Sequence, residues 1–97
     1  MPTYISLMKY TQQGLANIKE SPKRLKEGKA AAEKMGIRVI GVWVTMGEYD
    51  LVSVGEAPDM QTMAVFQLAL ARLGNVTTQT LRALSEEEFA EVVSRLP

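Results

Sequence analysis

One stretch, Arg38 to Glu56, constrains the fold more than any other part of the chain. It reads RVIGVWVTMGEYDLVSVGE, two runs of apolar and β-branched residues separated by Gly47-Glu48. Two such runs around a glycine-containing pair predict a β-hairpin. If Met46 and Tyr49 flank a two-residue loop, Gly47 takes the first central position of a type II′ turn, where positive φ is required.

The predicted register pairs Val44 with Leu51 and Trp43 with Val52. Alternation then divides the side chains between two faces. One face carries Ile40, Val42, Val44, Met46, Tyr49 and Leu51. The other carries Val39, Gly41, Trp43, Thr45, Asp50, Val52, Val54 and Glu56. A sheet with one face in water alternates apolar and polar residues cleanly, and this hairpin does not, so we expect both faces to be covered.

The rest of the chain supplies two more strands and the helices that connect them. Strands are predicted at Thr3–Tyr10 and Val76–Leu84, and helices from Thr11 through Ile18, from Ser21 to Gly36, from Pro58-Asp59 to Gly74, and from Ser85 to Leu96. Ser21 is expected at an N-cap with Pro22 at the first helical position, and Ser85 with Glu88 in a capping box.

This βαββαβα order predicts an α+β fold, a ferredoxin-like sandwich in one domain over residues 1–97. Right-handed crossovers give an antiparallel four-stranded sheet with two helices on one face and an extra C-terminal helix. The other face is expected to carry an apolar patch too large for a monomer. That patch is predicted to contain Tyr4, Met8, Trp43, Val52 and Val54. Its burial against a second copy predicts a homodimer, or a higher homo-oligomer, in the form of a dimeric α/β barrel.

Composition excludes several classes of function. Lysine plus arginine equals aspartate plus glutamate at 11 each, so the net charge favours neither nucleic acid nor a membrane surface. The chain has no cysteine and no histidine, which removes thiolate chemistry, the most common general base and the most common zinc ligand. No apolar run reaches about 18 residues, so we expect a soluble cytoplasmic protein with no membrane partner. We also expect no cofactor.

A basic segment and the βαββαβ order raise the question of RNA. Seven of the eleven basic residues lie between Lys19 and Arg38, where they could meet phosphates. We interpret the segment as a solvated helix face with i,i+4 pairs such as Lys23–Glu27. RNA-recognition domains stack bases on aromatic residues of their first and third strands, and the third strand here, LVSVGE, has none. We therefore expect no nucleic-acid partner.

Four segments together resemble the GYD domain family: MKYTQQG, ESPKR, TMGEYD and GNVTTQTLRALSEEEF. The resemblance covers nearly the whole chain, from Thr3 to Leu96. The residues of the family's signature correspond to Gly47, Tyr49 and Asp50, with Glu48 inserted. The resemblance implies a small protein of the dimeric α/β-barrel group, and it implies no settled activity.

A candidate ligand site can be assembled where the third strand begins. Because that strand lies antiparallel to the first, Asp50 is expected near Tyr10. Tyr10, Trp43 and Asp50 then line a pocket between sheet and partner, with Lys9 at its mouth and Tyr49 in the same set. A carboxylate between aromatic walls can orient a hydroxyl or amine, or act as a base.

A structural interpretation of the same residues is also open. In it, Gly47 and Glu48 form the turn and Asp50 accepts hydrogen bonds from turn N–H groups or from Thr45. Trp43 then belongs to the dimer core.

Two functions stay open at this point. The first is a non-catalytic homo-oligomeric module that binds a small molecule or serves as an assembly unit. The second is a cofactor-free enzyme, by analogy with monooxygenases and isomerases of the dimeric α/β-barrel group. Those enzymes usually place a histidine in their cavity, so its absence favours the module. Glu48 and Asp50 lack a third ligand, so no metal site is predicted.

Overall fold

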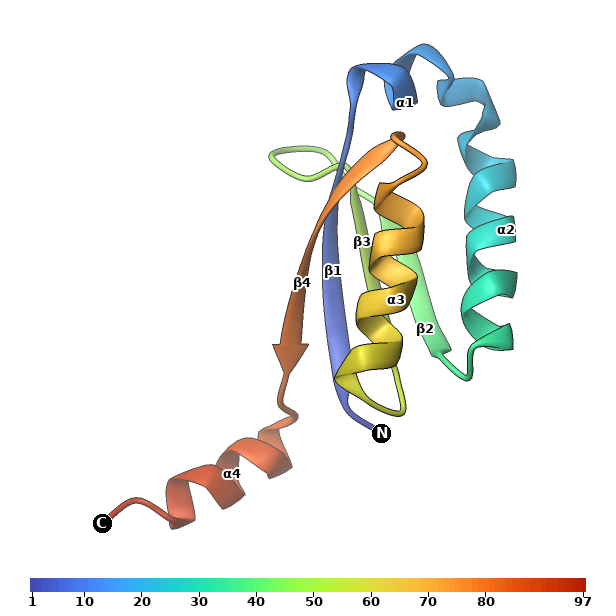
Figure 1. The fold of residues 1–97 in the computed structure, drawn as a ribbon. Coiled ribbons are helices and arrows are strands. Elements are labelled where there is room, and N and C mark those ends of the chain that lie inside the picture. Colours follow the sequence, from blue (N-terminus) through green and yellow to red (C-terminus); the bar gives the residue numbers. More distant parts are fainter.

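The computed structural model describes residues 1–97 and contains one antiparallel sheet with two long helices on one of its faces (Figure 1). The elements are β1 (Thr3–Tyr10), α1 (Gln12–Ala16), the 3₁₀ turn η1 (Ile18–Glu20), α2 (Ser21–Lys34), β2 (Arg38–Val44), β3 (Leu51–Glu56), α3 (Met60–Ala71), β4 (Val76–Ala83) and α4 (Glu86–Ser94). The strand order is β2-β3-β1-β4, and all three pairings are antiparallel. The predicted ferredoxin-like topology is confirmed.

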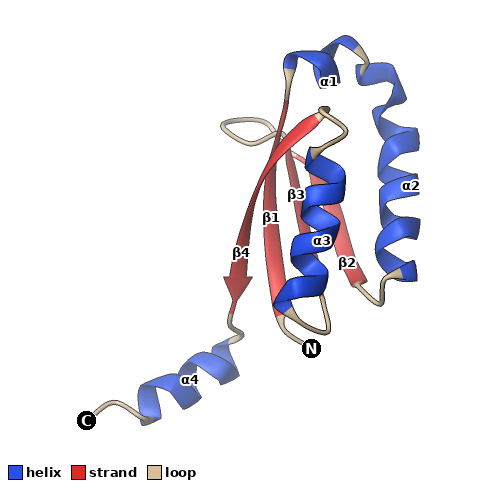
Figure 2. Cartoon of the chain, viewed as in Figure 1, coloured by secondary structure: helices blue, strands red, loops and turns tan.

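Local interactions mark the start of α3 and the ends of both covering helices. The Asp59 carboxylate accepts the Thr62 N–H at 2.7 Å and caps α3. Gly36 and Gly74 follow α2 and α3 with φ of 81° and 83°, in the left-handed region that glycine enters without strain. Figure 2 shows both helices on the same side of the sheet.

The predicted N-cap at Ser21 is wrong. Ser21 is the first residue of α2, and Glu20 precedes it without a side-chain cap. The Ser21 hydroxyl instead lies 2.5 Å from the hydroxyl of Tyr10. This contact joins the start of α2 to the end of β1, so the serine serves tertiary packing. Pro22 is the second residue of the helix, one position later than predicted but still in the first turn.

The capping box of α4 is confirmed. The Ser85 hydroxyl accepts the Glu88 N–H at 3.1 Å, and the Glu88 carboxylate accepts the Ser85 N–H at 3.0 Å. That backbone hydrogen bond is the main reason why the pKa of Glu88 lies below its ordinary value of 4.5. A carboxyl with a lowered pKa stabilises the fold fully above its ordinary pKa, and the stabilisation is lost as the pH falls through the folded-state value.

We therefore expect α4 to fray on acidification from about pH 6 to about pH 3, because protonation of Glu88 removes a charged cap. Backbone ¹³Cα shifts of residues 86–94 measure this loss of helix. In the Glu88→Gln variant, which keeps an uncharged acceptor, the same pH change should have a smaller effect. Equal fraying in both proteins would contradict the assignment.

The core lies between the sheet and the helices α2 and α3. Tyr4, Ser6 and Met8 of β1 point into it and are buried. The prediction that Tyr4 and Met8 share the open face with Trp43 is therefore wrong. Alternation decides which residues share a face, but it does not say which face meets the helices. The polar residue of this set, Ser6, accepts a hydrogen bond from Gln67 Nε2 of α3 at 2.8 Å, which satisfies it inside the core.

A β-bulge changes the predicted faces of β2. The register shifts between Val39 and Gly41, so that Val39 lies opposite Gly55 and Gly41 opposite Val54. Val39 therefore packs against the core instead of sharing a face with Trp43. Ile40, which the strict alternation placed with Leu51, is exposed. A β-bulge places one extra residue on one strand of a pair, so it interrupts the regular alternation of side chains between the two faces.

The hairpin loop is longer than predicted. β2 ends at Val44 and β3 begins at Leu51, so six residues, 45–50, form a loop that projects from the sheet (Figure 1). Thr45 closes it: its N–H donates to Asp50 O at 2.8 Å and its hydroxyl to Tyr49 O at 2.6 Å. Gly47 has the expected positive φ, of 133°, but the two-residue type II′ turn is not formed. The predicted strand register is confirmed.

The last helix, α4, lies apart from the rest of the molecule. It extends beyond the end of β4, away from α2 and α3 (Figure 1). All of its residues are exposed, including Phe89, Val92 and Val93. No helix in the chain has the length and apolar character that crossing a membrane requires.

Candidate functional site

The face of the sheet opposite the helices is uncovered and largely apolar. Register places Trp43, Val52, Leu7 and Gln79 in one row across the four strands, and Gly41, Val54, Ile5 and Leu81 in the next. We call these two rows the open face. Trp43 is 52 % exposed as a residue, and its indole lies against Gly41, where an added Cβ would come within 2.5 Å of the ring. Glycine at this position lets the indole lie flat on the sheet.

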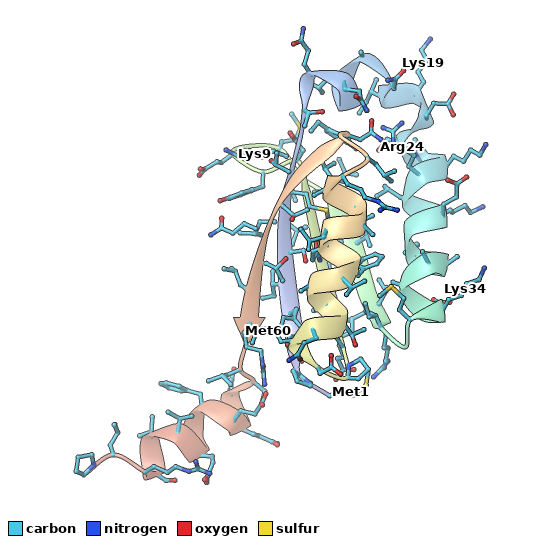
Figure 3. The ribbon with its side chains drawn as sticks, in the orientation of Figure 1. Met1, Lys9, Lys19, Arg24, Lys34 and Met60 are labelled. Carbon is cyan, nitrogen blue, oxygen red and sulfur yellow. The ribbon has the colours of Figure 1, made fainter.

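One end of the open face carries a group of polar side chains that we call the polar corner: Lys9, Glu48, Tyr49 and Gln79. The Lys9 ammonium lies 3.8 Å from a Glu48 carboxylate oxygen and 5.3 Å from the centroid of the Tyr49 ring. The Tyr49 hydroxyl donates to Gln79 Oε1 at 2.7 Å. A shallow groove of about 210 Å³ lies beside this group, lined by Lys9, Tyr49 and Gln79 together with Leu7, Thr77 and Thr78. Figure 3 shows Lys9 beside the projecting loop.

Asp50 connects two central strands at the end of the sheet. Its N–H donates to Met8 O at 2.8 Å, and its carboxylate accepts the Tyr10 N–H at 2.9 Å. It therefore continues the β1–β3 pairing beyond the last backbone pair, Met8 with Leu51. The proximity of Asp50 to Tyr10 is as predicted. The donor to the Asp50 carboxylate is the backbone of β1, however, whereas Thr45 donates to the backbone oxygen of Asp50.

We expect the Asp50→Ala variant to lose about 1–2 kcal/mol in the free energy of unfolding, because the Tyr10 N–H is left without its charged acceptor. Asp50→Asn keeps an acceptor oxygen and should lose less than half of that. Urea unfolding of the three proteins measures both values. A loss in Asp50→Asn as large as in Asp50→Ala would show that the negative charge, and not the hydrogen bond, matters.

The predicted site residues do not converge on one pocket. Tyr10 lies on the helix side of the sheet, bonded to Ser21, whereas Trp43 lies on the open face. The prediction that these two aromatic residues line one pocket is therefore wrong. Lys9 and Tyr49 do lie together, at the polar corner.

Two features were missed by the sequence reasoning. The apolar residues of the open face in β1 and β4 are Ile5, Leu7 and Leu81. The helix α4 carries Phe89, Val92 and Val93, and Leu96 follows it; all four are exposed. The helical spacing of the second set was visible in the sequence and marks an apolar stripe. The open-face residues could not be assigned to that face from the sequence, because the strand β1 is apolar on both faces.

The arrangement of polar groups favours binding over proton transfer. The three carboxylates near the open face are all engaged, Glu48 with Lys9, Asp50 with the Tyr10 N–H and Glu56 with Arg38. The polar corner offers a lysine, a phenol and an amide at the rim of an apolar surface. Such a combination is typical of a protein interface, where a polar rim surrounds an apolar centre.

Solved structures share this fold at low sequence identity. The structure of FFRP-DM1 is 20% identical, with a TM-score of 0.63, and the match covers 87% of this chain and 100% of that chain. A hypothetical protein from Pyrococcus horikoshii is also 20% identical, with a TM-score of 0.62 over 89% of this chain and 93% of that chain. A protein from Thermus thermophilus is 23% identical, with a TM-score of 0.55 over 88% of this chain and 95% of that chain.

A curated relative is much more similar in sequence. It is the glutamine synthetase and cystathionine beta-lyase binding protein of Thermus thermophilus, which is 38% identical over 97 residues and matches over 99% of each chain. The family model described as the GYD domain matches residues 4–93. Gly47, Tyr49 and Asp50, which the sequence resemblance matches to the family's signature, lie in the projecting loop between β2 and β3. The chain belongs to the GYD domain family.

Proposed function

We propose that this protein is a non-catalytic binding module, which pairs with a second copy through the open face and acts by binding other proteins. The observation that carries the proposal is the open face itself: two rows of side chains across four strands, mostly apolar, with no helix over them. Contiguous apolar patches that span a sheet are rarely left in water by monomeric proteins. A second sheet of the same kind is complementary to it, as in sheet-on-sheet packing.

The polar corner fits this arrangement as the rim of the interface. Lys9 contacts Glu48 and Tyr49, and Tyr49 contacts Gln79, so part of the side-chain arrangement that an interface requires already exists in one copy. The half-exposed Trp43 supplies the kind of large aromatic side chain that carries much of the binding energy in interfaces.

Proteins as partners are supported by the curated relative, whose name states that it binds two enzymes. Pairing through the open face leaves α4 and Met46 of the loop 45–50 outside the interface, whereas Glu48 and Tyr49 of that loop belong to its rim. Met46 is 99 % exposed in that loop, and α4 adds an exposed apolar stripe. These segments are the surfaces that we expect a larger partner to contact.

The test of protein binding uses purified glutamine synthetase and cystathionine β-lyase from the same source as this chain, immobilised for biolayer interferometry. We expect saturable binding to one or both enzymes, weakened by Phe89→Ser in α4 and unaffected by Lys26→Ala on the exposed side of α2. Turnover of the immobilised enzymes need not change. No binding to either enzyme at concentrations where the protein is dimeric would reject this part of the proposal.

A further inference from the structure

A cavity lies on the other side of the sheet, between the sheet and the helices α2 and α3. Its volume is about 120 Å³, and its walls are mainly apolar, formed among others by Met8, Leu25, Val42, Leu51, Phe66 and Leu70. An apolar cavity of about 150 Å³ holds one benzene molecule. The space beneath α2 and α3 is therefore close to the size of one aromatic ring.

The cavity stays open because α2 carries a glycine where a side chain would fit. A Cβ added at Gly28 would meet nothing nearer than Leu70 Cδ2, at 4.0 Å. Glycine in the middle of a helix lowers helix stability relative to any larger residue that fits. Packing alone would favour a larger side chain at this position, so the glycine preserves space at the expense of helix stability.

The charged groups in the wall are all positive. Arg24 and Lys29 line the cavity, and no carboxylate does. Arg24 Nη1 donates to Asn17 O at 3.1 Å, whereas its Nη2 is buried without any hydrogen-bond partner. Figure 3 places Arg24 on the side of α2 that faces α3. A buried guanidinium nitrogen without an acceptor is costly, and the acceptor that best fits its geometry is a carboxylate.

We propose that this cavity binds a small carboxylate whose apolar body is the size of one aromatic ring. The body occupies the space that Gly28 leaves open, and a carboxylate oxygen accepts from Arg24 Nη2. Lys29 adds a second positive charge at the same wall, and the paired hydroxyls of Tyr10 and Ser21 offer a further hydrogen-bonding group. The site is separate from the open face, because the sheet lies between them.

The probe is phenylacetate, with phenylacetamide as its neutral analogue of the same shape. Binding is followed by the ¹H–¹³C methyl shifts of Leu25, Val42 and Leu70. We expect saturable shifts with phenylacetate at a Kd of about 1 mM or tighter. Phenylacetamide should bind about tenfold more weakly, since it lacks the charge that Arg24 recognises.

Two variants test the cavity and the Arg24 guanidinium separately. Arg24→Met should weaken phenylacetate about tenfold and leave phenylacetamide unchanged. Gly28→Leu fills the cavity and should abolish binding of both compounds without lowering the melting temperature. Lys26→Met, which removes a positive charge from the same helix outside the cavity, is the control and should bind as the wild type does.

Three results would overturn the proposal. They are the absence of saturable methyl shifts, equal affinity for the acid and the amide, and undiminished binding by Gly28→Leu. None of these bears on pairing through the open face, which is tested by the mass of the assembly, so the two proposals succeed or fail separately.

Discussion

Replacing Leu7 with glutamate is expected to convert the proposed dimer into a monomer of 10.7 kDa. Leu7 lies on the central strand β1, opposite Val52 on one side and Gln79 on the other. Pairing of two open faces would bury the new carboxylate without a partner. An unpaired buried charge costs about 4 kcal/mol, which corresponds to a rise of roughly a thousandfold in the dimer dissociation constant. Sedimentation velocity at micromolar concentrations measures the result.

The control for this experiment is Ala30→Glu, which adds the same charge at an exposed position of α2. It should leave the proposed dimer intact. Trp43→Ala tests the same interface by truncation, and we expect a loss of about 2 kcal/mol, or about thirtyfold in affinity. Far-ultraviolet circular dichroism establishes that each variant is folded. A folded Leu7→Glu protein that stays as dimeric as Ala30→Glu would contradict pairing through the open face.

The second large effect is expected at Leu51. This side chain, only 2 % exposed, is buried at the start of β3 and packs beneath the helices. Leu51→Ala should lower the free energy of unfolding by about 3 kcal/mol, because it removes buried methyl groups and enlarges a cavity that already exists. For a domain whose total stability is about 5–15 kcal/mol, that loss is a large fraction. Urea unfolding measures it.

Val44 provides a matched control, since it lies directly opposite Leu51 in the register but is 68 % exposed. Val44→Ala should change the free energy of unfolding by less than about 0.5 kcal/mol. If the two substitutions cost the same, the assignment of Leu51 to the core and of Val44 to the surface would be wrong. The urea dependence of the free energy should be unchanged in both, as both keep the two-state transition.

The sequence predicts the elements of this protein well because its local signals agree with one another. Asp59 and the Ser85–Glu88 pair mark helix starts, and Gly36 and Gly74 mark helix ends. These are interactions between near neighbours in the chain, so they can be recognised without knowledge of the fold. The strand order followed from the sequence of elements and from the handedness of the crossovers.

The errors arise where a long-range contact decides between equal local choices. Both faces of β1 are apolar enough to be the core, and the helices select the face with Tyr4 and Met8. The bulge between Val39 and Gly41 depends on pairing with Gly55 and Val54, which no periodicity reveals.

The predictions for the candidate site also held where local pairing decides and failed where a long-range contact decides. Asp50 beside Tyr10 was predictable because antiparallel pairing fixes which residues meet at a strand end. The separation of Tyr10 from Trp43 was not, because it depends on the face that the helices cover. The Arg24 guanidinium in the cavity gave no signal, since the sequence shows only one of several basic residues on α2.

The most direct test of the central claim is an isotope-filtered NOE experiment on a mixture of labelled and unlabelled copies, which detects contacts between copies only. Pairing through the open face predicts intermolecular NOEs from the Trp43 indole to methyl groups of Ile5, Leu7 or Leu81. Intermolecular NOEs confined to α4 or to the helices α2 and α3, or none at all in a protein that sediments as a monomer, would contradict the account.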